Sequence, residues 1–98
     1  LTVNDIEPEA NGLEDDQTLT LYPNPGRDLM VMSLDNAETG NIMIRVSDIS
    51  GRVIHEVTDV KRYESWSRNV PMASQEPGVY IVELTIGENT YKQRWIKQ

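Results

Sequence analysis

Residues 41–60, NIMIRVSDISGRVIHEVTDV, contain the pattern that decides the fold. Their first half alternates strictly, and the aliphatic side chains on one side of the predicted strand are Ile42, Ile44 and Val46. An alternation with a period of two is typical of a β-strand with one buried face. The stretch 48–51, DISG, follows with turn residues, and Gly51 is free to adopt a positive φ. The pattern therefore predicts an antiparallel hairpin with strands over 41–47 and 52–60.

Short β-prone runs continue in both directions from this hairpin, separated by Gly, Pro, Asn and Asp. Further strands are predicted at 18–22, 28–34, 65–70, 79–86 and 90–97. No stretch shows the period of about 3.6 residues that is typical of a helix. Short strands at regular spacing, with turn signals between them, are typical of an antiparallel sandwich. The sequence therefore predicts an all-β fold, an antiparallel immunoglobulin-like β-sandwich of about seven strands.

The predicted core comes from the hairpin and from the run 79–86. Both segments place alternate apolar side chains on one face, and the inward set is Ile42, Ile44, Val46, Tyr80, Val82 and Leu84. The turn 87–89, GEN, then joins that run to the last strand. A chain of 98 residues is long enough for one such core, so a single folded domain is expected.

Negative charge is concentrated at the start of the chain. The whole chain has 9 basic and 16 acidic residues, a net charge of −7. Residues 1–17 contain six acidic and no basic residues, so their charge is −6, which leaves −1 for residues 18–98. The first segment is expected to be an acidic flexible linker that contains a processing site, ahead of a folded domain at 18–98. The acidic balance argues against nucleic-acid binding, and no apolar run is long enough to insert into a membrane.

Motifs for catalysis, metal binding and cofactor binding are missing from the sequence. There is no cysteine and one histidine, His55, which is expected to be a half-buried sheet residue. The glycines are isolated turn residues, so no phosphate-binding loop is present. Three adjacent acids, Glu14, Asp15 and Asp16, lack the alternate spacing of a calcium-binding loop. The sequence thus predicts no enzyme activity, no cofactor and no metal site.

The aromatic side chains allow two interpretations. They are either a sugar-stacking platform or core residues and cross-strand pairs, and the set is Trp66, Trp95, Tyr63, Tyr80 and Tyr91. Aromatic residues in strands are more often core residues. Separately from the aromatic residues, the sequence leaves one functional alternative open, an immunoglobulin-like binding or spacer module of a secreted adhesin or glycanase.

Four motifs in a fixed order resemble those of a known family. They are LYPNP at 21–25, IRVSDISGRV at 44–53, PGVYIV at 77–82 and YKQRWIKQ at 91–98. Their order resembles the type A C-terminal sorting domain of the type IX (Por) secretion system of Bacteroidetes, over about residues 19–98. One departure is Arg94, where lysine is common in the family and the positive charge is kept.

The resemblance implies two groups of important residues. The structural residues of the family motifs are Tyr22, Pro23, Asn24, Pro25, Asp48, Gly51 and Val53. The residues expected to be recognised as the sorting signal are Gly78, Tyr80, Lys92, Arg94, Trp95, Ile96, Lys97 and Gln98.

The last strand has a charge opposite to that of the whole chain. The final ten residues carry three positive charges and no acid, so Lys92, Arg94 and Lys97 are expected to be displayed together near the end of the domain. If the strand lies at a sheet edge, its free backbone groups are also expected to be able to pair with a receptor strand. A solvated edge, where lysines prevent aggregation, is the compatible simpler interpretation.

The resemblance also implies a function. The domain follows an N-terminal cargo domain and is an export address, not an enzyme. The cargo folds in the periplasm, the outer-membrane translocon recognises the domain, and a sortase-like cell-surface protease commonly removes it upstream of the first strand. The cargo then stays at the outer-membrane cell surface or is secreted. The implied partners are the translocon and the protease, with no nucleic acid and no direct membrane insertion.

Overall fold

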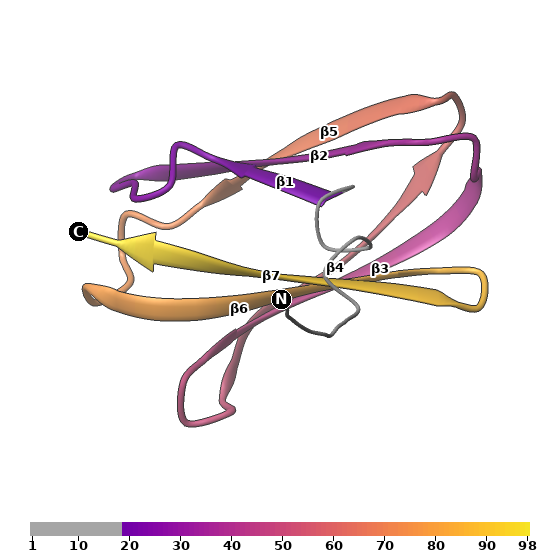
Figure 1. Ribbon diagram of the computed structural model, residues 1–98. Helices are drawn as coiled ribbons and strands as arrows, with labels where there is room; N and C mark the ends of the chain where they lie inside the picture. Colours follow the sequence, from indigo (N-terminus) through magenta and orange to yellow (C-terminus); the bar gives the residue numbers. More distant parts are fainter. Residues whose placement is uncertain (1–18) are drawn as a thin grey trace, which may run out of the picture.

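The computed structural model describes residues 19–98, which are built of β-strands (Figure 1). The seven strands are β1 (Leu19–Tyr22), β2 (Leu29–Asp35), β3 (Gly40–Asp48), β4 (Val53–Lys61), β5 (Ser65–Pro71), β6 (Gly78–Ile86) and β7 (Asn89–Lys97). No helix occurs within this part of the chain. The predicted all-β sandwich is therefore confirmed, and each predicted strand end lies within one residue of the observed one.

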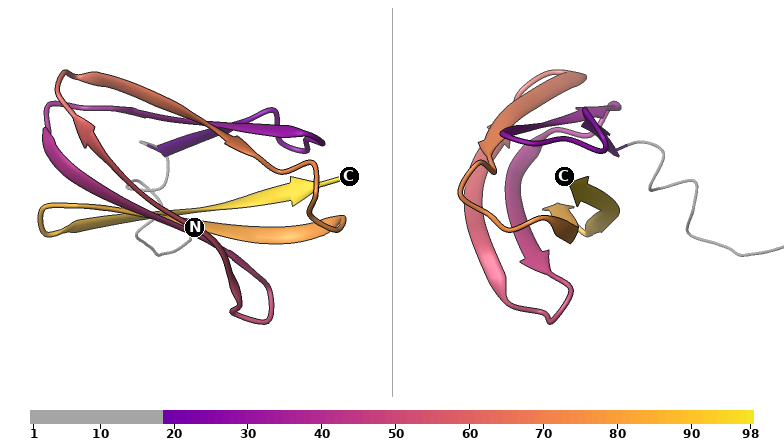
Figure 2. Two further views of the ribbon diagram at one scale, coloured as in Figure 1. Left: turned by 180° about the vertical axis from the view of Figure 1, so that it is seen from behind. Right: turned by 90° about the vertical axis from the view of Figure 1, so that its left-hand side faces the viewer.

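The strands form two antiparallel sheets that pack face to face (Figure 2). The three-stranded sheet has the order β1-β2-β5, and the four-stranded sheet has the order β4-β3-β6-β7. The chain crosses from one sheet to the other after β2, β4 and β5. Strands β4 and β7 are consequently the two edges of the four-stranded sheet, so the last strand of the chain is an edge strand.

The hairpin expected from residues 41–60 is β3 paired with β4. Ile44 on β3 lies opposite Val57 on β4, as the alternation of buried residues requires. The turn between the strands contains Gly51 at φ 92°. A side chain at this position would strain the backbone, which explains why glycine stands there.

The hydrophobic core lies between the two sheets. All six residues predicted to face inward are buried, namely Ile42, Ile44, Val46, Tyr80, Val82 and Leu84. The three-stranded sheet contributes a matching buried set, Leu19, Leu21, Met30, Met32, Leu34, Trp66 and Val70. Trp95 of β7 is completely buried in the same cluster. Both ends of the described chain, β1 and β7, are thus held by one core.

Two charged side chains, Asp59 and Lys61, are held in place at the edge strand β4. The Asp59 carboxylate accepts hydrogen bonds from the Val60 N–H at 2.7 Å, the Trp66 indole at 3.2 Å and the Arg68 guanidinium at 3.1 Å. These donors, the Val60 N–H foremost, hold the pKa of Asp59 below its ordinary value. Lys61 is fully buried and donates to three backbone carbonyls of the adjacent loops. A charge that points inward from an edge strand prevents that edge from pairing with another chain.

Some predictions fall on residues that the structure does not describe. The acidic linker at 1–17, its processing site and the acidic cluster at 14–16 lie outside residues 19–98. The domain boundary at residue 18 stays a prediction for the same reason. Within the described residues, no helix is both long and apolar enough to cross a membrane.

Candidate functional site

Strand β7 contains most of the residues expected to form the sorting signal, and its side chains alternate between two faces. The buried inward set is Tyr91, Trp95 and Lys97. The exposed outward set is Lys92, Arg94 and Ile96, followed by Gln98 beyond the strand end. The last strand therefore offers a partner one face, while its other face belongs to the core.

Lys97 is not displayed together with Lys92 and Arg94, so this expectation is wrong. Its side chain is 9% exposed and lies on the opposite face of the sheet. The reason is the period of two in a β-strand, which places residues 92 and 94 on one face and residue 97 on the other. The exposed positive charge of β7 is therefore carried by Lys92 and Arg94.

The outer edge of β7 is occupied by residues 23–26, PNPG, which follow β1; we call this segment the PNPG clamp (Figure 1). The Asn24 side-chain amide donates to the Arg94 carbonyl at 2.9 Å, and the Ile96 N–H donates to Asn24 Oδ1 at 3.0 Å. The Gly26 N–H donates to the Ile96 carbonyl at 2.9 Å, and the Gln98 N–H donates to the Gly26 carbonyl at 2.8 Å. The clamp thus acts as a short additional strand, parallel to β7 at Gly26.

The PNPG clamp limits what the edge of β7 can bind. Strand addition needs backbone N–H and C=O groups that have no partner. The clamp already uses such groups of Arg94, Ile96 and Gln98. The end of β7 is therefore closed to strand addition in the folded domain, and the expected free backbone groups are not present there.

Gly26 and Trp95 explain how the clamp approaches β7 so closely. The Trp95 indole N–H donates to the Pro23 carbonyl at 2.7 Å. A Cβ atom at Gly26 would stand 2.7 Å from both the Pro23 carbonyl oxygen and Trp95 Cζ2, which is closer than such atoms approach in proteins. The clamp therefore needs glycine at residue 26, one position beyond the LYPNP motif.

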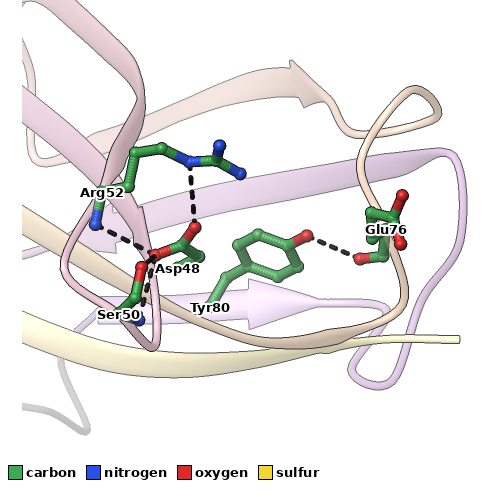
Figure 3. A network of polar contacts seen from close by, with 5 residues as sticks. All are labelled: Asp48, Ser50, Arg52, Glu76 and Tyr80. Carbon is green, nitrogen blue, oxygen red and sulfur yellow. Dashed lines mark hydrogen bonds and ion pairs between the residues drawn. The ribbon is translucent and has the colours of Figure 1, made fainter.

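The PGVYIV motif places β6 beside β7. Gly78 lies opposite Lys97, and Tyr80 lies opposite Trp95. Tyr80 is buried, and its hydroxyl donates to the Glu76 carbonyl at 2.6 Å, which fixes the loop before β6 (Figure 3). Tyr80 therefore supports the surroundings of β7 from within the core, whereas Gly78 is exposed.

The DISG turn is held by a single carboxylate (Figure 3). Asp48 Oδ1 accepts hydrogen bonds from the Ser50 N–H at 3.0 Å, the Ser50 hydroxyl at 2.6 Å and the Arg52 N–H at 3.0 Å. Asp48 Oδ2 accepts one from Arg52 Nε at 3.1 Å. These hydrogen bonds, that of the Ser50 hydroxyl first, hold the pKa of Asp48 below its ordinary value. The turn is therefore well defined although it lies at the surface, and it presents Ile49 and Val53 in fixed positions.

A row of alternating charges crosses the outer face of the four-stranded sheet. Successive strands place Glu56, Arg45, Glu83 and Lys92 side by side in register. Arg45 contacts Glu56 at 2.8 Å, and Lys92 contacts Glu83 at 3.7 Å. The hydrogen bond to Glu56 is the main reason why the pKa of Arg45 is raised. The charges within this row balance one another.

The aromatic side chains form no exposed platform. Four of them are buried, Trp66, Tyr80, Tyr91 and Trp95, so the core interpretation is confirmed for these, and Tyr63 is exposed. His55 is half-buried, as expected, and its Nε2 lies 3.0 Å from the Pro71 carbonyl oxygen. Among residues 19–98, no three His, Cys, Asp or Glu side chains come together as a metal site.

Four residues of the site were not identified from the sequence, namely Gly26, Ser50, Arg52 and Glu76. Ser50 and Arg52 stand close to Asp48 in sequence, and an Asp that begins a turn before a glycine is a recognisable signal for such hydrogen bonds. Gly26 and Glu76 act through their backbones on Ile96, Gln98 and Tyr80. No local pattern indicates a contact of that kind.

The fold and the site define a class of protein, a small antiparallel β-sandwich whose motifs gather around its C-terminal strand. The sequence model of the secretion system C-terminal sorting domain matches residues 20–98. The chain belongs to this family, the C-terminal sorting domains of the type IX secretion system, as the four ordered motifs predicted.

Two individual proteins also resemble this chain. The cell surface glycoprotein of Halobacterium salinarum is 34% identical over 71 residues, which cover 69% of this chain and 8% of the glycoprotein. The crystal structure of dimeric latent PorU from Porphyromonas gingivalis aligns with a TM-score of 0.68 at 16% identity, covering 81% of this chain and 9% of that chain. This second likeness shows a shared fold. The chain thus spans less than a tenth of the length of either protein.

Proposed function

We propose that this chain is the export address of a type IX cargo protein and that it is read as a folded shape. The observation that carries the proposal is the PNPG clamp, in which Asn24 and Gly26 bind the backbone of β7. A motif at the start of the domain and the strand at its end thus make one structure. The family match over residues 20–98 supports the sorting role.

The proposed role is that of a ligand and a protease substrate. A domain of this kind is recognised by the translocon and needs no catalytic group or cofactor of its own. The cargo precedes it in the chain, folds in the periplasm and passes through the outer membrane to the cell surface or the medium. The similarity to a cell surface glycoprotein supports a surface destination.

The sortase-like protease is proposed to cut within residues 1–17. The family match begins at residue 20, and β1 begins at Leu19. A cut ahead of these residues leaves the domain intact, whereas a cut within the sandwich has to open a hydrogen-bonded strand. The folded domain at 18–98 is then released as one piece.

The residues of the sorting signal are proposed to fall into two roles. Direct contact with the translocon is assigned to the exposed side chains Lys92, Arg94, Ile96 and Gln98. Support of the strand that carries them is assigned to Gly78, Tyr80, Trp95 and Lys97, of which the last three are buried.

A reporter fusion tests the proposed function. Residues 1–98 are joined to the C-terminus of a neutral reporter with an N-terminal signal peptide, in a host with a type IX system. The reporter should appear at the cell surface or in the medium, and it should stay in the periplasm of a strain that lacks the translocon. A fusion to residues 1–17 alone is the matched control and should stay in the periplasm. Periplasmic retention of the full fusion, with its domain folded, would contradict the proposal.

A binding or spacer module of a secreted adhesin or glycanase is the second candidate. The similarity to a cell surface glycoprotein is the observation that favours it. A module of this kind leaves the reporter in the periplasm in both strains, so the same experiment separates the two functions.

A further inference from the structure

The outer face of the four-stranded sheet contains an apolar patch at one end. We define the outer patch as Ile49, Val53, Ile81, Arg94 and Ile96. Ile49 is 77% exposed, Val53 45% and Ile96 43%. The strand register aligns Val53, Ser47, Ile81 and Arg94 across four strands, and Ile96 follows two residues further along β7, on the same face. Apolar side chains gathered on one exposed face are a candidate surface for binding.

The outer patch joins three separate family motifs. Ile49 and Val53 come from IRVSDISGRV, Ile81 comes from PGVYIV, and Arg94 and Ile96 come from YKQRWIKQ. A surface hollow of about 260 Å³ adjoins the patch and shares Ile49 and Ile81 with it. Its other lining residues are Ser47, Asp48, Gly51, Glu83 and Lys92. The four hydrogen bonds to Asp48 fix one wall of this hollow. A fixed wall loses little conformational freedom when a partner binds, which favours affinity.

The charge of the patch indicates the chemistry of the partner. The neighbouring row from Glu56 to Lys92 is balanced within itself. None of the four ion pairs found among residues 19–98 involves Arg94. Its cross-strand neighbour is Ile81, and Ile96 follows it on the same face. A guanidinium group flanked by Ile81 and Ile96, with no ion pair of its own within residues 19–98, fits a partner that supplies a carboxylate.

Recognition through this face is consistent with the closed edge of β7. The PNPG clamp leaves the backbone of Arg94 and Ile96 engaged, while their side chains point outward and are exposed. A partner therefore reaches the end of the last strand through its outward side chains. The same face presents the DISG turn.

We propose that the outer patch is the translocon contact, and that it binds a protein segment with an apolar side chain for the hollow and an Asp or Glu for Arg94. This inference rests on the proposed function and names the surface and the partner chemistry. A lipopolysaccharide phosphate is less favoured, because the patch is mainly aliphatic and has one cation without an ion pair. Binding of a second copy of the domain is an outcome that the crosslinking test below separates from binding of the translocon.

Site-specific photo-crosslinking tests this proposal in the reporter fusion. A photoreactive phenylalanine analogue replaces Ile49 in the outer patch or, as the matched control, Leu29, which is 41% exposed on the other sheet. Position 49 should give one protein adduct in the competent host, and its partner peptide, sequenced by mass spectrometry, should contain Asp or Glu beside apolar residues. Position 29 should give no such adduct.

Charge variants of Arg94 make the test specific. Arg94→Glu should lower the adduct yield by about tenfold, and Arg94→Lys should largely retain it. Replacing the acid of the crosslinked peptide by lysine should restore the yield with Arg94→Glu. An unchanged melting temperature of each variant shows that the domain stays folded.

The outcomes separate this inference from the proposed function. An unmodified fusion that stays in the periplasm overturns both. If the fusion is exported normally, the crosslinking result decides on the outer patch alone. The outer patch is overturned if position 49 gives no adduct, or an adduct with lipopolysaccharide or with a second copy. It is also overturned if the adduct yield does not change with Arg94→Glu.

Discussion

The Ile96 N–H donates a hydrogen bond to Asn24 Oδ1 at 3.0 Å, across 72 residues of sequence. The side-chain amide of Asn24 donates a hydrogen bond to the Arg94 carbonyl at 2.9 Å, so one side chain binds two backbone groups of the last strand. The YPNP motif and the C-terminal strand, which belong to opposite ends of the domain, are therefore one structural unit. This relationship makes the behaviour of the last strand depend on a residue near the start of the domain.

Asn24→Ala should lower the free energy of unfolding by about 1–2 kcal/mol, because two hydrogen bonds to β7 are lost. Amide hydrogen exchange should become faster at Ile96, whose N–H loses its acceptor. Asn69→Ala is a matched control at an exposed position of β5 and should change the stability by less than about 0.5 kcal/mol. Unchanged exchange at Ile96 in Asn24→Ala would show that the clamp does not form in solution.

Gly26→Ala should destabilise the domain by about 1–3 kcal/mol, since the new methyl group meets the Pro23 carbonyl oxygen and Trp95 Cζ2 at 2.7 Å. The indole N–H resonance of Trp95 should shift at the same time, because its hydrogen bond to Pro23 is disturbed. Gly51→Ala is the contrasting variant. It strains a backbone with φ 92° in open space and should leave that resonance in place. Equal shifts in both variants would contradict the close contact at Gly26.

Ile44→Ala and Leu84→Ala should each lower the free energy of unfolding by about 2–5 kcal/mol. Both side chains are fully buried between the sheets. Ile49→Ala removes a similar group that is 77% exposed, so it should cost less than about 0.5 kcal/mol in denaturant unfolding. A core assignment based on these residues fails if the three variants unfold at the same denaturant concentration.

Asp48 should make the domain sensitive to acid. Its pKa in the folded state is lowered, mainly by the Ser50 hydroxyl, so the ionised form stabilises the fold above the pKa of the unfolded chain. This contribution is lost as the pH falls below about 4, towards the lowered pKa of the folded state. The stability difference between the natural chain and Asp48→Asn should therefore be largest near neutral pH and shrink in acid, as measured by denaturant unfolding at several pH values.

Asp59 also contributes to the acid sensitivity of the domain, because its pKa is likewise lowered in the folded state. The Asp48→Asn variant should therefore keep part of the acid sensitivity, and the further change Asp59→Asn should reduce it again. A stability difference for Asp48→Asn that grows in acid would have the wrong sign and would rule out the hydrogen-bonded turn.

The strands and the core followed from short-range patterns. The alternation at Ile42, Ile44 and Val46 predicts both a strand and its buried face, because the β-pleat turns successive side chains to opposite sides. The same rule, applied to the last strand, separates Lys97 from Lys92 and Arg94, although net charge alone suggested that they act together. The motif order was likewise sufficient for the family.

The contacts that build the site depend instead on how the two sheets meet. No local pattern places Asn24 and Gly26 against the edge of β7, because that contact requires β1 and β7 to be brought together by a shared core. Nor does sequence alone align Val53, Ile81 and Arg94 on one face, since the register across four strands is set by pairings distant in the chain. The pleat is a property of each strand, whereas the closing of an edge and the composition of a face arise from packing between strands.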